Sequence, residues 1–334
     1  MTAHPYRDDI PPVESGPRPQ WSVMIPTYNN DDYLPRTLTA VLEQALPADE
    51  MQIEVVDDCS TAGDAGSLVR KIAGDRVAYF RQPANLGVAQ NLSNCIARSR
   101  GQLVHLLHGD DFVLPGFYER LGQGFAAAEE IGLAFCRYSY IDQNGTEIDR
   151  APLEQKTPGL LPDHLRRLAS EQRICAPSVV VRRTAYERLG GFDRRLRCTE
   201  DWEMWVRIAA AFPVWYEPAT LACYRMHDAG NTGRNVSSGD DMAYTGKAID
   251  LFADYLPAAI AGDVTRRARE TYACAALDMA YSLWQAGDRR AARAQLGVAF
   301  RLRRSPRVAA RFLQLFGRGL LSWTTDRKPG GRTA

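Results

Sequence analysis

The stretch that decides the fold reads Glu54-Val55-Val56-Asp57-Asp58, a short apolar run that ends in two aspartates. A second strand-like run, residues 103–107, leads into His108, Gly109 and the pair Asp110-Asp111. Adjacent carboxylates repel each other, so they make better sense where a divalent cation, a sugar hydroxyl or a reacting proton needs oxygen ligands. Ligands of open α/β sheets bind beyond the carboxyl ends of the strands. We therefore expect both pairs to face one pocket that handles a nucleotide diphosphate.

Strand-like and helix-like segments alternate around these two runs, which predicts a parallel sheet flanked by helices. The predicted strands are 21–26, 53–56, 77–81 and 103–107, and the predicted helices are 33–46, 66–73 and 88–99. Further strands are expected at 133–141 and 178–182, with an Asn144-Gly145 turn between them. The fold class is therefore α/β.

Composition is that of an ordinary globular protein with a sizeable core. The chain has 334 residues, of which 45% are hydrophobic and 24% charged. Its seven cysteines show no CxxC spacing, which indicates reduced thiols and excludes a disulfide framework or a zinc site. We find no signal-peptide pattern and no apolar run of the roughly 18 to 20 residues that a spanning helix needs. These features predict a soluble, cytoplasmic protein.

Three regions are expected along the chain. Residues 1–20 are polar and rich in proline and are predicted to be disordered. Residues 21–237 form the α/β domain, and residues 238–334 form a helical C-terminal region. Within that region, 272–286 and 289–302 resemble a helical hairpin turned at Gly287-Asp288.

The C-terminal tail carries a large excess of positive charge. From Arg289 to the end there are twelve Arg or Lys and one acid, although the whole chain has a net charge of only +1. Residues 304–323 read as a basic amphipathic helix, which could lie on an anionic membrane surface as a peripheral contact. Alternatively, its apolar face packs on the protein's own helices or on the second copy of a homodimer. A solvated helix face explains the charge equally well.

Seven motifs together resemble the family 2 glycosyltransferases of bacterial type, which have the GT-A fold. They cover about residues 21–230 and comprise Val23–Asn30, Glu54–Ser60, Asn85–Asn91, His108–Asp111, Gly190–Asp193, Thr199–Arg207 and Tyr224–His227. The resemblance implies an inverting enzyme that transfers a sugar from a nucleotide sugar. The Gln-x-x-Arg-Trp motif of processive synthases is absent, so a single transfer is expected.

The resemblance also assigns a donor-binding set: Pro26, Thr27, Tyr28, Asn29, Asp58, Asn91 and Asp110. It places Asp58 at the edge of a pyrimidine ring, where a carboxylate accepts the imide N–H, whereas Asp57 shapes the turn. On residues alone, the Asp57-Asp58 pair could merely cap the following helix. The 26–29 segment could also be an ordinary proline turn.

Asp111 is the metal ligand that the resemblance implies, with Mn²⁺ or Mg²⁺ as the cofactor. Asp110 would contact the ribose or position the metal ligands, and His227 or Arg225 could touch the phosphates or the metal. Two positions depart from the family pattern. His108 replaces a frequent Asp and is expected to be a structural histidine, and Gln90 replaces a frequent Arg.

A third acidic pair, Glu200-Asp201, opens a predicted helix. The resemblance makes Asp201 the general base that deprotonates the acceptor hydroxyl. Glu200 and Trp202 are expected in the pocket for the acceptor and sugar, although Glu200 could simply complement the helix dipole and Trp202 could belong to the core.

The function expected from these residues is transfer of a single sugar, from a UDP-sugar in the first instance, to a hydroxyl of a glycan or lipid-linked acceptor in cell-surface polysaccharide synthesis. No nucleic-acid partner is expected. The alternative is a non-catalytic scaffold of the same fold that binds sugar nucleotides or glycans. Such a scaffold has no need of Asp201. A nucleotidyltransferase would want a glycine-rich phosphate loop after the first strand, which is absent.

Overall fold

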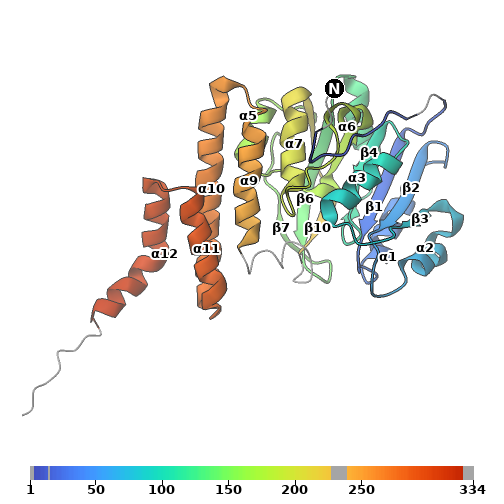
Figure 1. Ribbon diagram of the computed structural model, residues 1–334. Coiled ribbons are helices and arrows are strands. Elements are labelled where there is room, and N and C mark those ends of the chain that lie inside the picture. Colours follow the sequence, from blue (N-terminus) through green and yellow to red (C-terminus); the bar gives the residue numbers. More distant parts are fainter. Residues whose placement is uncertain (1–3, 14–15, 227–238, 326–334) are drawn as a thin grey trace, which may run out of the picture.

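The computed structural model describes residues 4–13, 16–226 and 239–325, with side chains up to residue 317. A mixed, mostly parallel sheet forms the centre of the molecule, and helices cover both of its faces (Figure 1). The strands are β1 Trp21–Thr27, β2 Met51–Asp57, β3 Ala78–Arg81, β4 Leu103–Leu106, β5 Phe112–Val113, β6 Leu133–Ile141, β7 Glu147–Arg150, β8 Gly159–Leu160, β9 Val179–Arg182 and β10 Val214–Arg225.

The helices follow the strands along the chain and then continue alone. They are α1 Leu34–Leu42, α2 Ala65–Ala73, α3 Val88–Arg98, α4 Phe117–Ala127, α5 His164–Ser170, α6 Arg183–Leu189, α7 Glu200–Ala211, α9 Asp240–Ala253, α10 Ala258–Gln285, α11 Arg289–Leu302 and α12 Pro306–Thr325. The predicted elements of the first 110 residues are confirmed, with ends that differ by a few residues. The sequence reading missed the strands β5, β7, β8 and β10, the last of them 12 residues long, and the Asn144-Gly145 turn joins β6 to β7.

Strand order in the sheet is β3-β2-β1-β4-β9-β6-β10-β5. Strands β3, β2, β1 and β4 are parallel, β9 runs against both of its neighbours, and β6 and β10 are parallel to each other. Residues of β1 are buried on both faces, which explains why its sequence is a nearly continuous apolar run and does not alternate. The carboxyl ends of β1, β2 and β4 consequently meet at one edge of the sheet.

Each face of the sheet has its own hydrophobic core. Helices α1, α2 and α4 pack on one face, and α3, α6 and one side of α7 pack on the other. The opposite side of α7 packs against α9 and the first half of α10. The second half of α10 packs against α11 and α12. Helix α7 therefore lies between the α/β domain and the C-terminal helices, as Figure 1 also shows.

The N-terminal segment is ordered, so the prediction of disorder for residues 1–20 is wrong for residues 4–13. Ile10 is buried in the core beneath α3 and α6. The carbonyls of Tyr6 and Asp8 accept hydrogen bonds from the amides of Arg194 and Gly191, at 2.9 and 2.8 Å. The polar, proline-rich composition gave no signal that this segment packs on the protein, because the packing depends on backbone groups and on one isoleucine.

The C-terminal tail packs on the protein's own helices over the part whose side chains are described. Val308 is fully buried, and Phe312 and Leu315 lie partly buried against α10 and α11. The ring of Phe316 contacts those of Tyr281 and Trp284 in α10. These contacts correspond to the alternative in which the apolar face of the tail packs on the protein's own helices. Within the described residues, no helix is long and apolar enough to span a membrane.

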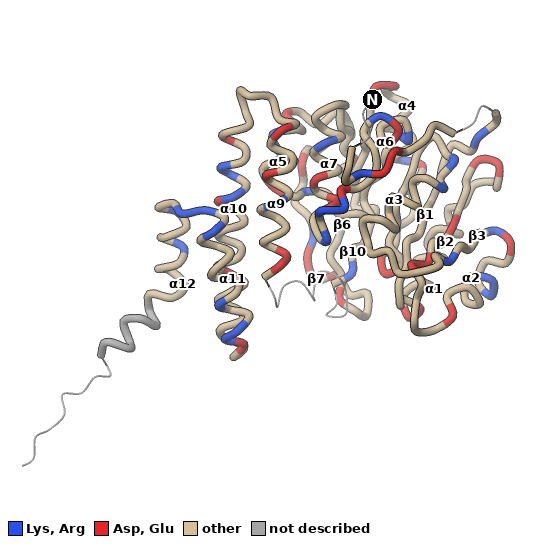
Figure 2. Tube along the Cα trace, in the orientation of Figure 1, with Lys and Arg blue, Asp and Glu red and all other residues tan. Residues whose placement is uncertain are grey.

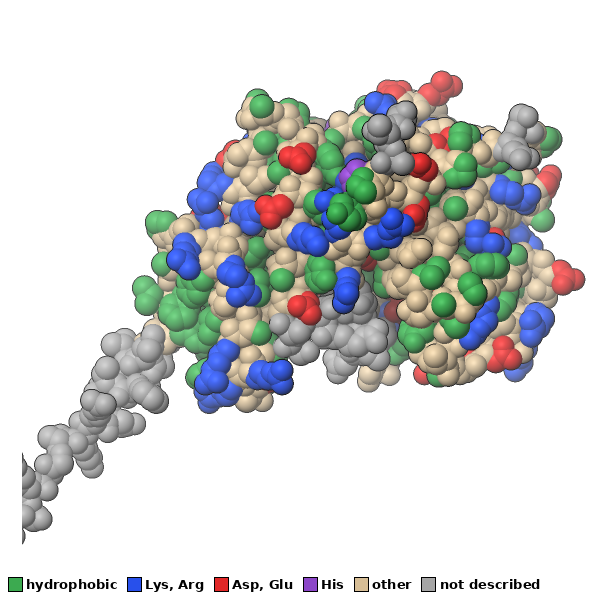
Figure 3. All heavy atoms as spheres, in the orientation of Figure 1, with side chains coloured by type: hydrophobic (Ala, Val, Ile, Leu, Met, Phe, Trp, Pro, Cys, Tyr) green, Lys and Arg blue, Asp and Glu red, His purple; other side chains and the backbone are tan. Residues whose placement is uncertain are grey.

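Positive charge gathers over these helices. Positions coloured blue for Lys and Arg recur along α10, α11 and α12 in Figure 2, and several blue side chains lie on the surface over these helices in Figure 3. Arg301, Arg304 and Arg307 are exposed, whereas Arg311 pairs with Asp278 of α10 through its Nη2, at 2.6 Å. Part of the basic face is thus used inside the protein, and part remains on the surface.

Candidate functional site

The two aspartate pairs lie at the same edge of the sheet. Thr27 at the end of β1 faces Asp57 at the end of β2, and β4 on the other side of β1 leads into Asp110 and Asp111. Gly109 allows the close approach of these segments, because a Cβ added there would lie 2.8 Å from the Thr27 hydroxyl. The expectation that both pairs meet at one edge is confirmed.

Asp57 has every oxygen occupied by donors of the protein itself. Its Oδ1 accepts from the backbone N–H and the hydroxyl of Ser60, and its Oδ2 accepts from Tyr79 (2.8 Å) and Arg81 (2.7 Å). The carboxylate is fully buried. Burial, followed by the bond to Asp57, raises the pKa of Tyr79 to about 12. Asp57 therefore shapes the turn after β2, as its sequence position suggested.

Asp58 holds the loop that precedes α3. Its two oxygens accept the backbone N–H groups of Leu86 and Gly87 at 2.8 and 2.9 Å, and Asn85 donates to its carbonyl. Burial raises the pKa of this carboxyl above its ordinary value, although the two amides oppose the shift. A carboxylate oxygen can accept more than one hydrogen bond, so Asp58 retains capacity for a ligand.

The 26–29 segment is positioned by the turn after β2. Asn29 adopts a left-handed conformation (φ 54°), and its side-chain oxygen accepts the amides of Thr61 and Ala62. Pro26 and Tyr28 are half-buried. The hydroxyl of Thr27 is buried without a hydrogen-bond partner among the described residues, and such an atom is costly unless a ligand or water satisfies it.

Asn91 lies too deep for the donor contact expected of it. The side chain is 3% exposed, and its amide donates to the carbonyl of Val56 and accepts from Gln82, each at 3.2 Å. Both polar atoms therefore join α3 to the end of β2. The structure assigns Asn91 a role in packing and corrects its place in the donor set.

His108, Asp110 and Asp111 form the cluster that could hold a metal ion. One ligand atom of each lies within 4.8 Å of the others. Asp111 is 1% exposed; its Oδ1 accepts the amide of Arg225 at 2.8 Å, whereas Oδ2 has no partner among the described residues. Burial and then Asp110 raise the pKa of Asp111 well above its ordinary value. A buried, unpartnered carboxylate oxygen beside a second carboxylate and an imidazole fits a divalent cation. His108 thus lies with the candidate ligands, although it was expected to be structural.

Arg225 holds the turn that carries these aspartates and does not point a free guanidinium at a ligand. It donates to the carbonyls of Asp110, Asp142 and Gln143 at 2.9 to 3.0 Å. Its phosphate-contacting role is therefore not supported, and His227 lies outside the described residues. Beside this turn is a pocket of about 390 Å³, lined by Asp32, Tyr33, Arg36, Phe112, Gln143, Asn144, Gly145 and Arg225.

Glu200 and Asp201 open helix α7 after Thr199, which takes a left-handed conformation. Asp201 accepts from its neighbour's amide, Trp202 N–H, at 2.7 Å and from the side-chain amide of Gln172 at 2.8 Å. Burial raises the pKa of Asp201 to about 6. Burial and then Asp201 raise the pKa of Glu200 to about 8, and Oε2 of Glu200 has no partner among the described residues. Such a pair can keep one carboxylate as a base and the other as an acid near neutral pH.

Trp202 belongs to the core, which corrects its expected place in a sugar pocket. It is 1% exposed, and its ring packs against Phe252 of α9 and Tyr272 of α10, with centroids 5.0 and 5.1 Å apart. Its indole N–H donates to the carbonyl of Leu168 at 2.6 Å. Trp202 therefore fastens α7 to the C-terminal helices and offers no face to a sugar.

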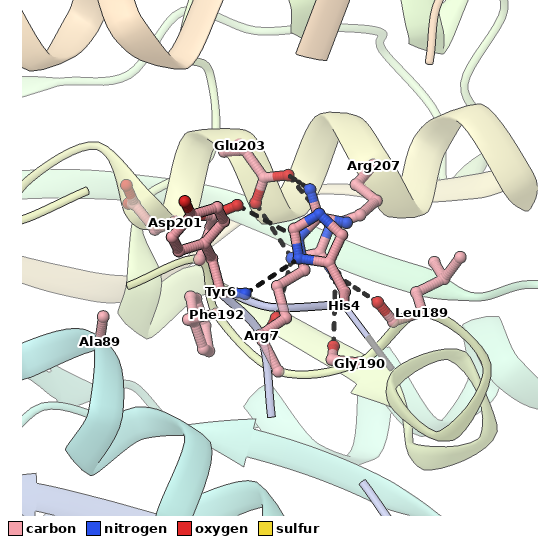
Figure 4. A network of polar contacts seen from close by, with 12 residues as sticks. His4, Tyr6, Arg7, Ala89, Leu189, Gly190, Phe192, Asp201, Glu203 and Arg207 are labelled. Atoms are coloured by element: carbon pink, nitrogen blue, oxygen red, sulfur yellow. Dashed lines mark hydrogen bonds and ion pairs between the residues drawn. The ribbon is translucent and has the colours of Figure 1, made fainter. Parts of the chain in front are cut away.

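Buried charges anchor the rest of α7 (Figure 4). Glu203 is fully buried and accepts from Arg207 one turn further on, from Tyr255, and from Arg7 of the N-terminal segment. Arg7 also reaches Asp193, at 3.3 Å. Sequence analysis missed Arg7, Gln172 and Tyr255, because their partners are distant along the chain and no local motif marks them.

The charges of Asp111 and Asp201 both act on one buried residue, Cys175. Burial first, and then these two charges, raise the pKa of its thiol well above the ordinary value. Cys175 is buried on the segment between α5 and β9.

Comparison with known proteins agrees with this arrangement. An uncharacterized Mycobacterium tuberculosis protein, MT1568, is 30% identical over 234 residues, which cover 65% of this chain and 70% of that protein. S. aureus TarS (residues 1–349), solved with UDP-GlcNAc, matches with a TM-score of 0.62 over 94% of both chains at 14% identity. The mannosyltransferase PcManGT of Pyrobaculum calidifontis, solved with GDP-Man and Mn²⁺, matches with a TM-score of 0.58 over 96% of this chain and 87% of that one at 19% identity.

These structural likenesses show the GT-A fold. The model of the family described as glycosyl transferase family 2 matches residues 22–190. This range includes the carboxyl ends of β1, β2 and β4 and both aspartate pairs. The chain therefore belongs to glycosyl transferase family 2 and is a glycosyltransferase.

Proposed function

We propose that the protein is a metal-dependent, inverting glycosyltransferase that moves one sugar from a nucleotide-diphosphate sugar to an acceptor hydroxyl. The observation that carries this proposal is the combination of an unpartnered carboxylate oxygen at the strand ends with a half-buried carboxylate of raised pKa at the start of α7. Oδ2 of Asp111 is a buried carboxylate oxygen without a partner among the described residues, and the half-buried Asp201 has a raised pKa. TarS binds UDP-GlcNAc and PcManGT binds GDP-Man with Mn²⁺, which supports a sugar nucleotide as the donor.

The donor side of the proposed site uses Asp58, Asp110, Asp111 and the 26–29 segment. Asp58 would accept the imide N–H of uracil with an oxygen that already orders the Leu86–Gly87 loop. Mn²⁺ or Mg²⁺ held by Asp111, with Asp110 and His108 beside it, would neutralise the negative charge of the diphosphate. The nucleotide fits a UDP-sugar on this account because a carboxylate acceptor complements that N–H.

The acceptor side uses Asp201 and Glu200. In the proposed reaction the acceptor oxygen attacks the anomeric carbon, the bond from that carbon to the diphosphate breaks, and the acceptor's proton moves to Asp201. An attack from the face opposite the leaving group inverts the anomeric centre. Asp201 is suited to accept the proton because its pKa of about 6 leaves it ionised at neutral pH.

The acceptor class that we propose is a glycan or a lipid-linked sugar, as in cell-surface polysaccharide synthesis. A lipid-linked acceptor would bring the protein to a membrane surface, where the exposed Arg301, Arg304 and Arg307 could meet anionic headgroups. Flotation with anionic vesicles at low and high salt tests this contact. Reversal of Arg304 and Arg307 to Glu should abolish salt-sensitive flotation, and if neither protein floats the basic patch serves another purpose.

A thermal-shift panel of nucleotide sugars, each with and without Mn²⁺, tests the proposed donor. A ligand that binds only the folded protein raises the unfolding temperature by mass action, so a UDP-sugar with Mn²⁺ should give a clear shift and the same compound with a chelator should not. The proposal fails if no nucleotide sugar shifts the transition. Binding without any turnover would favour the scaffold alternative instead.

A further inference from the structure

A glutamine from outside the family motifs contacts the proposed base. Gln172 lies just after α5, and its Nε2 donates to Oδ2 of Asp201 at 2.8 Å. Oδ1 of the same carboxylate accepts the Trp202 amide at 2.7 Å. With one donor on each oxygen, the plane of the carboxylate is fixed, and the remaining lone pairs are left for an acceptor hydroxyl.

The backbone of Gln172 is held by the C-terminal helices. Its N–H donates to the hydroxyl oxygen of Tyr272 in α10, at 2.9 Å. The Tyr272 ring in turn packs on Trp202, whose indole is fixed by the Leu168 carbonyl of α5. Tyr272, Gln172 and Asp201 therefore form a continuous path from α10 to the base, in which Gln172 and Tyr272 are 100 residues apart along the chain.

The neighbouring segment gives Gln172 a rigid support. Arg173 pairs with Glu154 at 2.9 Å and with Glu171 at 3.0 Å, and Arg166 of α5 pairs with Asp263 of α10 at 3.0 Å. Ile174 is buried in the core beneath the sheet. These contacts hold the segment that carries Gln172, and the bond to Asp201 sets the direction in which its amide donates.

We infer that Gln172 is a positioning residue for Asp201 and that α10 contributes to catalysis by holding Gln172. This rests on the proposed function, because it presumes that Asp201 is the base. A side-chain amide does not ionise near neutral pH, so Gln172 orients the carboxylate and stabilises its ionised form without competing for the proton. The C-terminal helices are thereby part of the catalytic apparatus.

The charge environment explains why such a donor matters. Among the described residues, the titratable groups on which the charge of Asp201 acts include Glu200 in the first turn of α7, Cys198 just before it, Tyr138 of β6, Cys175 after α5, and Tyr272 of α10, and all of these are neutral or acidic. Burial in this setting favours the protonated carboxyl, and the Gln172 bond opposes that tendency. Loss of the bond should therefore raise the pH at which Asp201 becomes a base.

The test compares the full-length protein with Gln172→Ala and with the nearly isosteric Gln172→Glu. Two readouts are measured against pH: UDP release from UDP-GlcNAc or UDP-glucose with Mn²⁺, and the ¹³C carboxyl signal of Asp201, assigned by its absence in Asp201→Asn. Gln172→Ala should lower UDP release at pH 7 on the order of 10-fold with unchanged UDP affinity, the scale expected for a hydrogen bond to a charged group. The pH midpoint of UDP release and the pH midpoint of the Asp201 carboxyl signal should both move to higher pH. The shift should be larger for Gln172→Glu than for Gln172→Ala, because Gln172→Glu replaces a donor with a competing carboxyl.

Tyr272→Phe should move both midpoints in the same direction by a smaller amount, since it removes only the acceptor of the Gln172 N–H. Tyr281→Phe is the matched control on the same helix, where the ring contacts Phe316, and should move neither. Unmoved midpoints in both Gln172 variants would overturn the inference. If the wild-type protein releases no UDP while the carboxyl signal still shifts, the proposed function fails and the contact stands.

Discussion

The two aspartate pairs at the sheet edge look alike in sequence and differ in what surrounds them. All four oxygens of Asp57 and Asp58 accept hydrogen bonds from the protein itself. Asp111 has a buried oxygen with no partner among the described residues, and Asp110 lies beside it. Satisfied carboxylates hold a turn and a loop in place. An unsatisfied one costs stability and is retained where a ligand completes it.

The third pair extends this comparison to the start of α7. Glu200 also keeps a buried oxygen without a partner among the described residues, and Asp201 beside it accepts one hydrogen bond on each oxygen. The second and third pairs thus each contain one carboxylate oxygen that the described residues leave unpartnered. On this basis, substitution of Asp57 should lower stability, and substitutions in the second and third pairs should lower function.

Asp201→Asn should give the largest effect. The amide keeps the size and the bond to Trp202 N–H but cannot take a proton, so transfer should fall by roughly 10²- to 10⁴-fold, the usual scale for loss of a general base. Binding of UDP with Mn²⁺ should stay near that of the wild type. Calorimetry and a UDP-release assay on the same preparation measure both. Near-normal transfer by the variant would place the base elsewhere.

Asp57→Ala should instead unfold more easily. The change leaves Ser60 and Tyr79 without their acceptor and removes the partner of Arg81, so the free energy of unfolding should fall by about 3 kcal/mol. Urea titration measures this, with the exposed Asp49→Ala as a control that should change stability by less than about 0.5 kcal/mol. If Asp57→Ala is as stable as the control, the distinction between the structural Asp57 and the functional carboxylates of the other pairs is wrong.

Glu200→Gln should change how stability depends on pH. The pKa of Glu200 is raised from 4.5 to about 8, so between these values the folded protein keeps a proton that the unfolded chain releases. Stability of the wild type should therefore fall as pH rises through this window. The variant should show a shallower fall in unfolding temperature between pH 5.5 and pH 8.5. Parallel curves would mean that Glu200 is ionised throughout.

Much of the fold could be predicted from the sequence because it depends on local patterns. The buried strand Trp21–Thr27 and the hairpin turn at Gly287 are written in consecutive residues. The short strands β7 and β8 were missed because they are four and two residues long and largely exposed, so they carry no periodic signal. The N-terminal segment was misjudged because Arg7 finds its partners, Asp193 and Glu203, far along the chain.

The sequence predicted the acidic residues of the candidate site but not the contacts that surround them. Motifs pointed to Asp58, Asp111 and Asp201, but only the packed structure separates carboxylates that are fully bonded from those that are not. Asn91 and Trp202 were expected in the donor site and the sugar pocket because of their motifs. A motif does not show how deeply a side chain is buried, and both of these side chains are buried. Gln172 carries no motif at all, and its role depends on where α10 places Tyr272.

The most direct test of the account is calorimetry of UDP binding to the wild type and to Asp111→Ala, with Mn²⁺ and with a chelator. Asp32→Ala is the control, because this exposed carboxylate lines the adjacent pocket and lies outside the metal cluster. The account predicts that the wild type and the control bind UDP only when Mn²⁺ is present, and that Asp111→Ala loses most of this binding. Equal binding by all three proteins with and without metal would contradict it.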